Sequence, residues 1–386
     1  MKNKALGIKL LIQFTIPVFL VLWLFVPTNS QVASSKFTFD IFTQEDGLPN
    51  NQIQCIYQDK KGWMWIGTSQ GLSRFDGYSF VNFLPDVNDS NSLNGNLVRV
   101  IKEDKNGNLL VGTENGGLNI FDRQKVRFSN PLKNHPDFKL KEVSVNAIET
   151  DKFGNIWLGT DFNILKIDTS GNLVSLNPDI KNQDVEFAGN YVRNLQFDNS
   201  GKLWIGTNNG VFVFNPASNQ MVQFDLPFEE NLNKEIWEIY LDEEGLIWIG
   251  TYSSGVFIID PVSDKIQPIQ LNPAIRRSET VRTISKGAFG EYWIGTRGGL
   301  YTYSKSRGVT GFYQHDERKP RSLSNNSILS VFHDNKGETW IGTRGGLNLL
   351  AKSKQVFHNF TSLPGDNHHL NSSTIYAFWI DKNKNI

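Results

Sequence analysis

The chain of 386 residues has one cysteine, Cys55, and no excess of charge of either sign, with 39 Lys and Arg against 39 Asp and Glu. A single cysteine excludes a disulfide framework and any metal site built from several cysteines. Balanced charge removes the basic surplus that neutralises phosphates, so we expect no nucleic-acid partner. The chain does not lack apolar residues: 39% are hydrophobic and 12% aromatic, enough to bury a sizeable core.

The first thirty residues form a separate segment. Lys2, Lys4 and Lys9 precede an apolar run of 17 residues over 10–26. A basic head followed by an apolar stretch is typical of a secretory signal, and we assign one to residues 1–30. The run is shorter than the ~20 residues of a membrane span, although an uncleaved anchor remains the alternative. We therefore expect the remainder of the chain to be exported.

A short motif of the form Trp-Ile-Gly-Thr recurs seven times, and its copies are separated by 44 to 47 residues. Six copies begin with tryptophan and the second begins with Leu110; the tryptophans are Trp65, Trp157, Trp204, Trp248, Trp293 and Trp340. The motif glycines are Gly67, Gly112, Gly159, Gly206, Gly250, Gly295 and Gly342. A strand-rich period in the mid-forties is typical of propeller blades. The sequence therefore predicts an all-β fold, a seven-bladed β-propeller of four-stranded blades over residues 31–365.

Each repeat has four strand signals, which in the first repeat lie at 53–58, 63–68, 71–75 and 78–83. An Asp-x-x-Gly turn joins the first two strands in every repeat except the sixth, where Gly287 replaces the aspartate. Alternation places the motif Trp and Gly on one face of their strand. Stacked blades bury both faces, so we interpret these residues as inter-blade packing rather than as sugar-binding platforms.

The two ends of the repeat region leave a choice open. Residues 37–42 can add the outer strand of the last blade and close the ring, but residues 355–360 compete for the same place. Residues 366–386 begin a further repeat, because 381–386 align with 59–64 and stop one residue before the expected tryptophan. We therefore expect a truncated product or a fragment of a longer frame.

Aligning the repeats gives two columns of residues near one mouth of the predicted channel. The first column, early in the first strand, is Gln54, Arg99, Asn146, Arg193, Trp237, Arg282 and Leu329. The second, after the motif threonine, is Gln70, Asn115, Phe162, Asn208, Tyr252, Arg297 and Arg344. The ligand-binding candidates among them are Arg99, Asn146, Arg193, Trp237, Tyr252, Arg282, Arg297 and Arg344. Aromatic rings can stack on sugars, and arginines can bind hydroxyls or a uronate carboxylate. The alternative is that these are solvated rim residues with structural partners.

Catalytic chemistry finds little support in the sequence. The aspartates are explained by turns, and the six histidines show no metal-ligand spacing. We predict no catalytic residue, no metal and no cofactor, with a propeller hydrolase or lyase as the least favoured function.

The segments 45–51, 53–59, 65–68 and 71–77 resemble two-component regulator propeller repeats, and the resemblance extends from residue 37 to the end. In the Bacteroidetes such repeats form the periplasmic sensor regions of hybrid two-component systems. The resemblance implies oligosaccharide sensing in the periplasm, no enzymatic activity of this chain itself, and a parent with a second propeller and a membrane-spanning histidine kinase. It also implies a possible homodimer. A standalone exported scaffold that binds carbohydrate or protein is the alternative.

Overall fold

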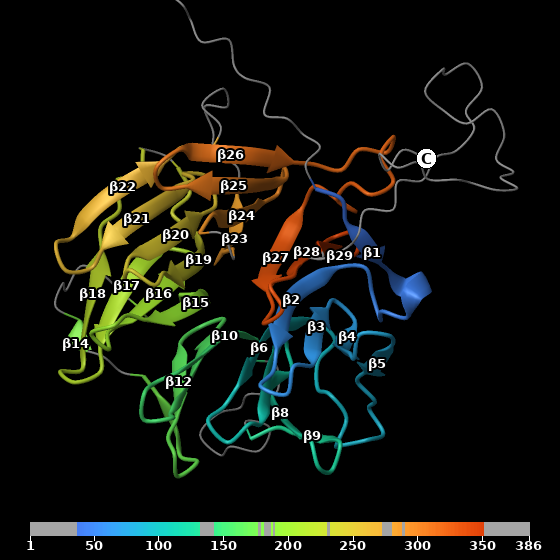
Figure 1. The fold of residues 1–386 in the computed structure, drawn as a ribbon. Helices are drawn as coiled ribbons and strands as arrows, with labels where there is room; N and C mark the ends of the chain where they lie inside the picture. Colours follow the sequence, from blue (N-terminus) through green and yellow to red (C-terminus); the bar gives the residue numbers. More distant parts are fainter. Residues whose placement is uncertain are drawn as a thin grey trace, which may run out of the picture.

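The computed structural model describes residues 37–131, 143–176, 179–180, 187, 190–229, 232–271, 280–287 and 290–350. Within them, seven antiparallel sheets are arranged as the blades of a ring around a central channel (Figure 1). Six sheets have four strands, and the fourth blade gains a fifth from the short parallel strand β14 (Asp179–Ile180). The predicted seven-bladed all-β propeller is confirmed.

The strands of each blade run outward from the channel in chain order. Blade 1 consists of β2 (Ile53–Gln58), β3 (Met64–Thr68), β4 (Gly71–Phe75) and β5 (Phe80–Phe83). Blade 2 consists of β6 (Val98–Glu103), β7 (Leu109–Thr113), β8 (Gly117–Asp122) and β9 (Arg127–Ser129). Blade 3 consists of β10 (Val145–Thr150), β11 (Ile156–Thr160), β12 (Ile164–Ile167) and β13 (Leu173–Ser175). Blade 4 consists of β15 (Val192–Phe197), β16 (Leu203–Thr207), β17 (Gly210–Asn215) and β18 (Gln220–Phe224). Blade 5 consists of β19 (Ile236–Leu241), β20 (Ile247–Thr251), β21 (Val256–Asp260) and β22 (Lys265–Ile269). Blade 6 consists of β23 (Val281–Lys286), β24 (Tyr292–Thr296), β25 (Leu300–Ser304) and β26 (Gly308–Tyr313). The three inner strands of blade 7 are β27 (Ile328–His333), β28 (Thr339–Thr343) and β29 (Leu347–Leu350).

The outer strand of blade 7 comes from the other end of the chain. Strand β1 (Asp40–Phe42) pairs antiparallel with β29, with Asp40 opposite Leu349 and Phe42 opposite Leu347 (Figure 1). Residues 37–42 therefore supply the closing strand, as one of the two alternatives predicted. The competing segment 355–360, the signal segment 1–30 and the further repeat at 366–386 lie outside the described residues.

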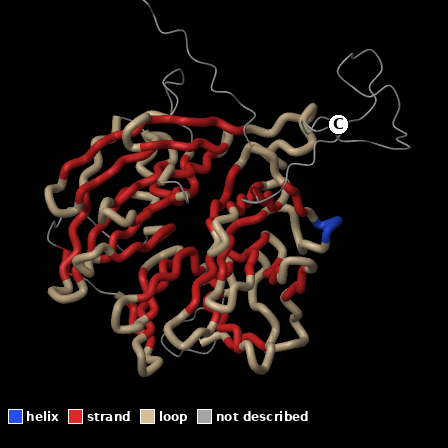
Figure 2. The backbone as a smooth tube through the Cα atoms, in the orientation of Figure 1, coloured by secondary structure: helices blue, strands red, loops and turns tan. Residues whose placement is uncertain are grey.

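Helix is almost absent from the described part of the chain, which holds one three-residue 3-10 turn at Gln44–Asp46 (Figure 2). Accordingly, no helix there is long and apolar enough to cross a membrane.

The motif glycine of every blade, and the motif tryptophan of the six blades that have one, face the next blade. Trp65 is 1% exposed and packs edge-on against Phe121 of blade 2. A Cβ added to Gly67 would lie 2.7 Å from Cγ1 of Val98, which opens the first strand of blade 2. The same contact, at 2.6 to 2.8 Å, occurs at all seven motif glycines. Glycine is therefore required where a β-branched residue of the following blade fits against the strand.

The turn aspartate has a second role that the sequence analysis missed. Oδ1 of Asp59 accepts the backbone N–H groups of Lys61 and Trp63, as expected of a turn residue, at 2.9 and 3.0 Å. Its Oδ2 accepts the indole N–H of Trp65 at 2.8 Å. The equivalent bonds join Asp151–Trp157, Asp198–Trp204, Asp242–Trp248 and Asp334–Trp340. The aspartate thereby satisfies the polar end of the buried indole.

The two irregular repeats replace this bond in different ways. In blade 2, where the side chain of Leu110 has no N–H to donate, Asn108 Nδ2 donates to Oδ2 of Asp104 at 2.8 Å. In blade 6, which lacks the aspartate, Trp293 donates instead to Oε1 of Glu291 at 2.8 Å. The turn carboxylate of blade 2 and the motif indole of blade 6 therefore both keep a hydrogen-bond partner.

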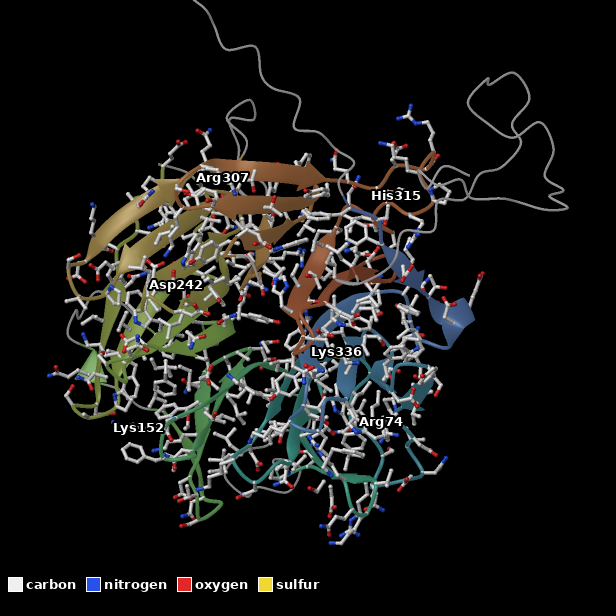
Figure 3. The ribbon with its side chains drawn as sticks, viewed as in Figure 1. Arg74, Lys152, Asp242, Arg307, His315 and Lys336 are labelled. Atoms are coloured by element: carbon white, nitrogen blue, oxygen red, sulfur yellow. The ribbon has the colours of Figure 1, made fainter. Side chains whose placement is uncertain are left out.

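Asp242, labelled in Figure 3, also links blade 5 to blade 6 through hydrogen bonds. Its side chain is fully buried, and Oδ2 accepts from Trp248 Nε1 at 2.9 Å, from Tyr292 OH at 2.9 Å and from Lys305 Nζ at 2.7 Å. Burial alone raises the pKa of Asp242, but the hydrogen bonds from these groups outweigh it and lower the pKa to about 2. The carboxylate is thus held in its charged form by donors from both blades.

Candidate functional site

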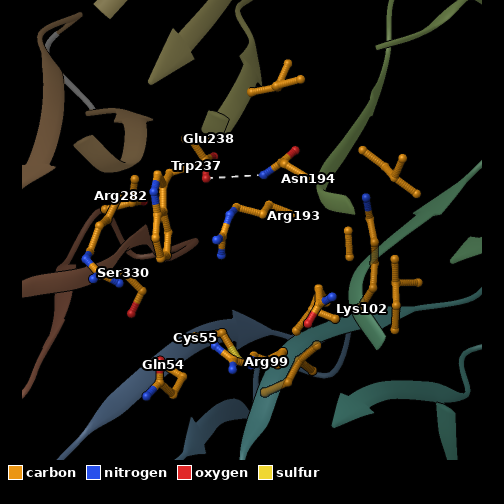
Figure 4. A pocket seen from close by; sticks show the side chains of 18 of the residues that line it. Gln54, Cys55, Arg99, Lys102, Arg193, Asn194, Trp237, Glu238, Arg282 and Ser330 are labelled. Atoms are coloured by element: carbon orange, nitrogen blue, oxygen red, sulfur yellow. Dashed lines mark hydrogen bonds between the residues drawn. The ribbon is translucent and has the colours of Figure 1, made fainter. Parts of the chain in front are cut away.

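A cavity of about 380 Å³ lies in the central channel, and the first strands of all seven blades line it (Figure 4). All seven residues of the first predicted column are in its wall: Gln54, Arg99, Asn146, Arg193, Trp237, Arg282 and Leu329. The structure therefore brings the first column together around one cavity.

A β-bulge explains why these residues share a direction. In blade 1, Ile53 pairs with Thr68 and Cys55 pairs with Gly67, so that Gln54 between them has no partner. The register of the first strand skips one residue at the same place in every blade, and the skipped residue is the first-column residue each time. A bulge releases one residue from the ladder and re-aims its side chain. The propeller thus presents one bulge side chain per blade to the channel.

The bulge was missed by the sequence analysis, although it leaves a signal. A regular strand buries every second residue, but β2 buries Ile53 and Ile56, three residues apart. An apolar pair with this spacing opens the first strand of every repeat: Ile53/Ile56, Val98/Ile101, Val145/Ile148, Val192/Leu195, Ile236/Ile239, Val281/Ile284 and Ile328/Val331. A spacing of three inside a strand predicts the extra residue.

The second column lies at the rim and not in the cavity wall. Four of its residues directly follow the motif threonine, and their backbone N–H groups donate to the carbonyl of the residue before the bulged strand, as Arg297 does to Thr280 and Arg344 to Ser327 at 3.2 Å. The other three stand one position later and donate to side-chain oxygens: Gln70 to Thr68, Asn115 to Ser144 and Phe162 to Thr160. None of Gln70, Asn115, Phe162, Asn208, Tyr252, Arg297 and Arg344 is among the lining residues of this cavity. Tyr252, a predicted sugar-stacking residue, is therefore outside it.

Five arginines from the two columns nevertheless converge. The pKa of Arg282 is lowered to about 10, first by burial and then by the positive charges of Arg344, Arg297, Arg193 and Arg99. We refer to these five residues as the arginine crown. Arginine side chains are not deprotonated at neutral pH, so the crown is cationic.

Trp237 separates two members of the crown (Figure 4). The guanidinium carbons of Arg193 and Arg282 lie 4.1 and 4.3 Å from the centre of its ring. Its indole N–H donates to Oε2 of Glu235 at 3.2 Å, and Glu235 also pairs with Arg193 at 3.2 Å. Because guanidinium groups already contact the indole, Trp237 positions the arginines and is not an open platform for a sugar.

Tyr191 is a lining residue that the sequence analysis missed. It precedes the first strand of blade 4, its ring lies 4.7 Å from the guanidinium of Arg193, and its hydroxyl donates to Oδ1 of Asn146 at 2.9 Å. The residue before a bulged strand is not aligned with either column, so the repeat pattern did not point to it.

A second layer lies next to the bulge residues along the same strands. It contains Cys55, Asn194, Glu238 and Ser330 among the lining residues. Oε2 of Glu238 accepts from Asn194 Nδ2 at 3.3 Å (Figure 4), and burial raises the pKa of Glu238 to about 8. The cavity is therefore cationic at its crown and carries a largely uncharged carboxyl group in the next layer at pH 7. Across the described part of the chain, His, Cys, Asp and Glu do not gather in any group of three that could hold a metal.

Comparison with known proteins places the repeat in a family. The family model described as a two-component regulator propeller matches residues 47–70, 92–115, 139–162, 186–209, 232–253 and 322–345. These segments lie in blades 1 to 5 and 7, and each includes the motif strand. The match confirms the resemblance drawn from the sequence.

Among curated proteins, a histidine kinase, P4, of Formosa agariphila is 37% identical over 73 residues, which are 19% of this chain and 5% of that protein. Among solved structures, the extracellular domain of a putative hybrid two-component system of B. thetaiotaomicron has a TM-score of 0.71 at 23% identity, covering 84% of this chain and 43% of that one. Virginiamycin B lyase of Staphylococcus aureus has a TM-score of 0.60 at 14% identity, covering 82% of this chain and 99% of that one. The chain thus spans less than half the length of the first two relatives, and the likeness to the solved structures shows the fold alone.

Proposed function

Because the chain is built from two-component regulator propeller repeats, we propose that it is the ligand-sensing part of a two-component regulator and acts by binding rather than by catalysis. The likeness to the extracellular domain of a putative hybrid two-component system and to part of a histidine kinase supports this role. The proposal includes export to the periplasm and a parent protein with a second propeller and a membrane-spanning kinase. We also propose that the chain forms a homodimer.

We propose an oligosaccharide as the signal, and one observation carries this: seven bulges present one side chain each to a single cavity of about 380 Å³. That volume lies within the roughly 300–1,000 Å³ of ligand pockets. The wall offers guanidinium, amide and hydroxyl groups that hydrogen-bond to sugar hydroxyls. A ligand held there contacts several blades at once, and it signals if it binds one receptor state more tightly than the other.

The likeness to virginiamycin B lyase does not extend to a proposed activity, because at 14% identity it concerns the fold. A standalone exported scaffold differs from the sensor in one testable respect. Ligand binding to a sensor changes the phosphorylation of a kinase domain, whereas binding to a scaffold has no such output.

Calorimetry of the full chain against a panel of neutral and acidic oligosaccharides tests the binding function. We expect one member to bind with micromolar affinity and the double variant Arg193→Ala/Trp237→Ala to lose it. Arg307, an exposed arginine in the turn between β25 and β26, provides the control Arg307→Ala, which should bind normally (Figure 3). Binding that survives the double variant would place the ligand elsewhere, and failure of every sugar to bind would reject the oligosaccharide signal.

A further inference from the structure

The arginine crown carries positive charge that the protein does not neutralise. Arg99 pairs with Glu114 at 2.7 Å and Arg193 pairs with Glu235 at 3.2 Å. The other three arginines, Arg282, Arg297 and Arg344, have no carboxylate within 4.0 Å among the described residues. Five cations and two carboxylates leave a charge of +3 at one mouth of a chain whose net charge is zero. Like charges held together disfavour one another unless an anion joins them.

The same residues present hydrogen-bond donors with no acceptor. The buried Nε atoms of Arg99, Arg193 and Arg282 have no partner, and neither does Nδ2 of Asn146. All four belong to bulge residues in the wall of one cavity. Unpaired buried donors are rare in folded proteins because a donor that leaves water without finding an acceptor loses its hydrogen bonds. A ligand with acceptor oxygens can therefore form hydrogen bonds with several residues of the cavity wall at once.

Charge and hydrogen bonding together select the chemistry of the ligand. A sugar hydroxyl supplies an acceptor but no charge, whereas a carboxylate or sulfate supplies several acceptor oxygens and a negative charge. Arginine binds such groups in a planar, two-pronged arrangement. The rings of Trp237 and Tyr191 hold the Arg193 guanidinium in place, so its ordering is complete before a ligand arrives.

We propose that the arginine crown binds the carboxylate or sulfate group of an acidic oligosaccharide. This inference rests on the oligosaccharide-sensing function proposed above and narrows it to acidic sugars. The layer beneath fits the rest of the sugar: Gln54 lies beside the crown, and Asn194, Glu238 and Ser330 supply polar groups for hydroxyls. A protonated Glu238 does not repel the acid and can donate a hydrogen bond to it or to a neighbouring hydroxyl.

Matched ligands that differ only in charge test the proposal with the full chain. Tetramers of galacturonate, glucuronate and mannuronate are titrated beside their methyl esters, and sulfated tetrasaccharides beside their desulfated forms. We expect at least one acidic form to bind at least tenfold more tightly than its neutral counterpart. That preference should weaken severalfold between 50 and 200 mM NaCl, because salt screens the charges. The pair that shows it identifies the acid as carboxylate or sulfate.

Variants locate the effect at the crown. Arg282→Gln should reduce affinity for the acidic form about tenfold more than affinity for the neutral form. Arg344→Gln, an exposed member of the crown, serves the same purpose if Arg282→Gln fails to fold. Arg307→Gln is the matched control and should bind as the unmodified chain does.

The outcomes separate the inference from the function on which it rests. If a neutral tetramer binds as tightly as its acidic form, and both crown variants bind the two forms as the unmodified chain does, the acidic-ligand inference is wrong. The proposed oligosaccharide-sensing function then stands without it. If no acidic or neutral sugar binds, both the inference and the proposed function are rejected.

Discussion

Replacing Asp242 by Asn is expected to destabilise the propeller by about 3–5 kcal/mol. The fully buried carboxylate accepts two backbone N–H groups of its own turn with Oδ1, and Trp248, Tyr292 and Lys305 with Oδ2. Asparagine keeps one acceptor oxygen, which the turn requires, so its NH₂ group then faces three donors. The Tyr292 hydroxyl can rotate to accept, but the indole N–H loses its acceptor, and Lys305 loses its bond to the buried carboxylate and keeps only Glu244, at 3.0 Å. A hydrogen bond involving a charged group contributes about 1.5–3 kcal/mol, which gives the expected loss.

Thermal unfolding measures this effect. An unfolding entropy of about 2.1 cal/mol/K per residue over roughly 300 residues makes 1 kcal/mol equivalent to about 1.5 °C, so Tm should fall by about 5–8 °C. Asp168→Asn is the matched control, because Asp168 forms the same turn and accepts from Ser170 N and Asn172 N at 2.8 and 2.9 Å. Asp168 has no tryptophan or lysine bound to it in the described structure, and we expect its variant to lose much less stability than Asp242→Asn does.

The loss should also depend on pH. Asp242 has a pKa of about 2 in the folded protein, against about 3.9 in an unfolded chain. A lowered pKa means that the carboxylate stabilises the fold fully above about pH 4, and that this contribution disappears as pH falls through 2. The stability gap between the unmodified chain and Asp242→Asn should therefore contract by roughly 2 kcal/mol between pH 5 and pH 2. A gap that stays constant over this range, or equal losses in the two variants, would refute the account of a charged link between blades 5 and 6.

Three further predictions concern the packing, the channel and the closure of the ring. Gly295→Ala places a Cβ 2.6 Å from side-chain carbons of Ile328 and Thr283, so the urea midpoint should fall by the equivalent of about 1–3 kcal/mol; an unchanged midpoint would show that the blades can separate without penalty. Glu238→Gln should flatten the pH dependence of stability. Folded Glu238 has a pKa of about 8 and keeps a proton that the unfolded chain releases above about pH 4.3. In the unmodified chain, stability should therefore fall as pH rises between these two values. Parallel pH profiles of the variant and the unmodified chain would contradict this assignment. Phe42→Ala removes ring contacts with Phe75 and Trp340 and should lower stability by about 2–4 kcal/mol in thermal unfolding, whereas a loss below 1 kcal/mol would mean that β1 contributes little to closure.

The sequence predicts the fold well because the features that build a blade are local and repeated. The turn at Asp59, the motif strand beginning near Trp65 and the third strand at Gly71 lie within 20 residues of one another. Because this pattern of turn and strands occurs seven times, the predicted fold does not depend on any single repeat. The closing strand is harder, because pairing of Phe42 with Leu347 joins residues 305 positions apart, and sequence alone left residues 355–360 as an equal competitor.

The candidate site is predicted in part, and what is missing has physical causes. Repeat alignment found the bulge column, since a structural position recurs even when its residue changes from Gln54 to Arg99. Tyr252, also proposed as a ligand contact, does not line the cavity, and alternation along the chain does not say how far a loop reaches over the mouth. Repeat alignment missed Glu238, whose raised pKa comes from its burial in the folded channel and is not encoded in the local sequence. The arginine contacts with Trp237 join neighbouring blades and likewise require the folded ring.

The closure of the ring by β1 has a consequence for how the molecule is made. Synthesis at about 5–20 residues per second separates the appearance of β1 from that of β29 by roughly 15–60 s. During that interval Phe39 and Phe42 have no blade 7 to cover them, and β1 remains an open strand edge. The first segment of the propeller to be made is thus the last to be paired. Any factor that shields an exposed strand until the chain is complete would act on this segment, and its benefit would end once β29 is formed.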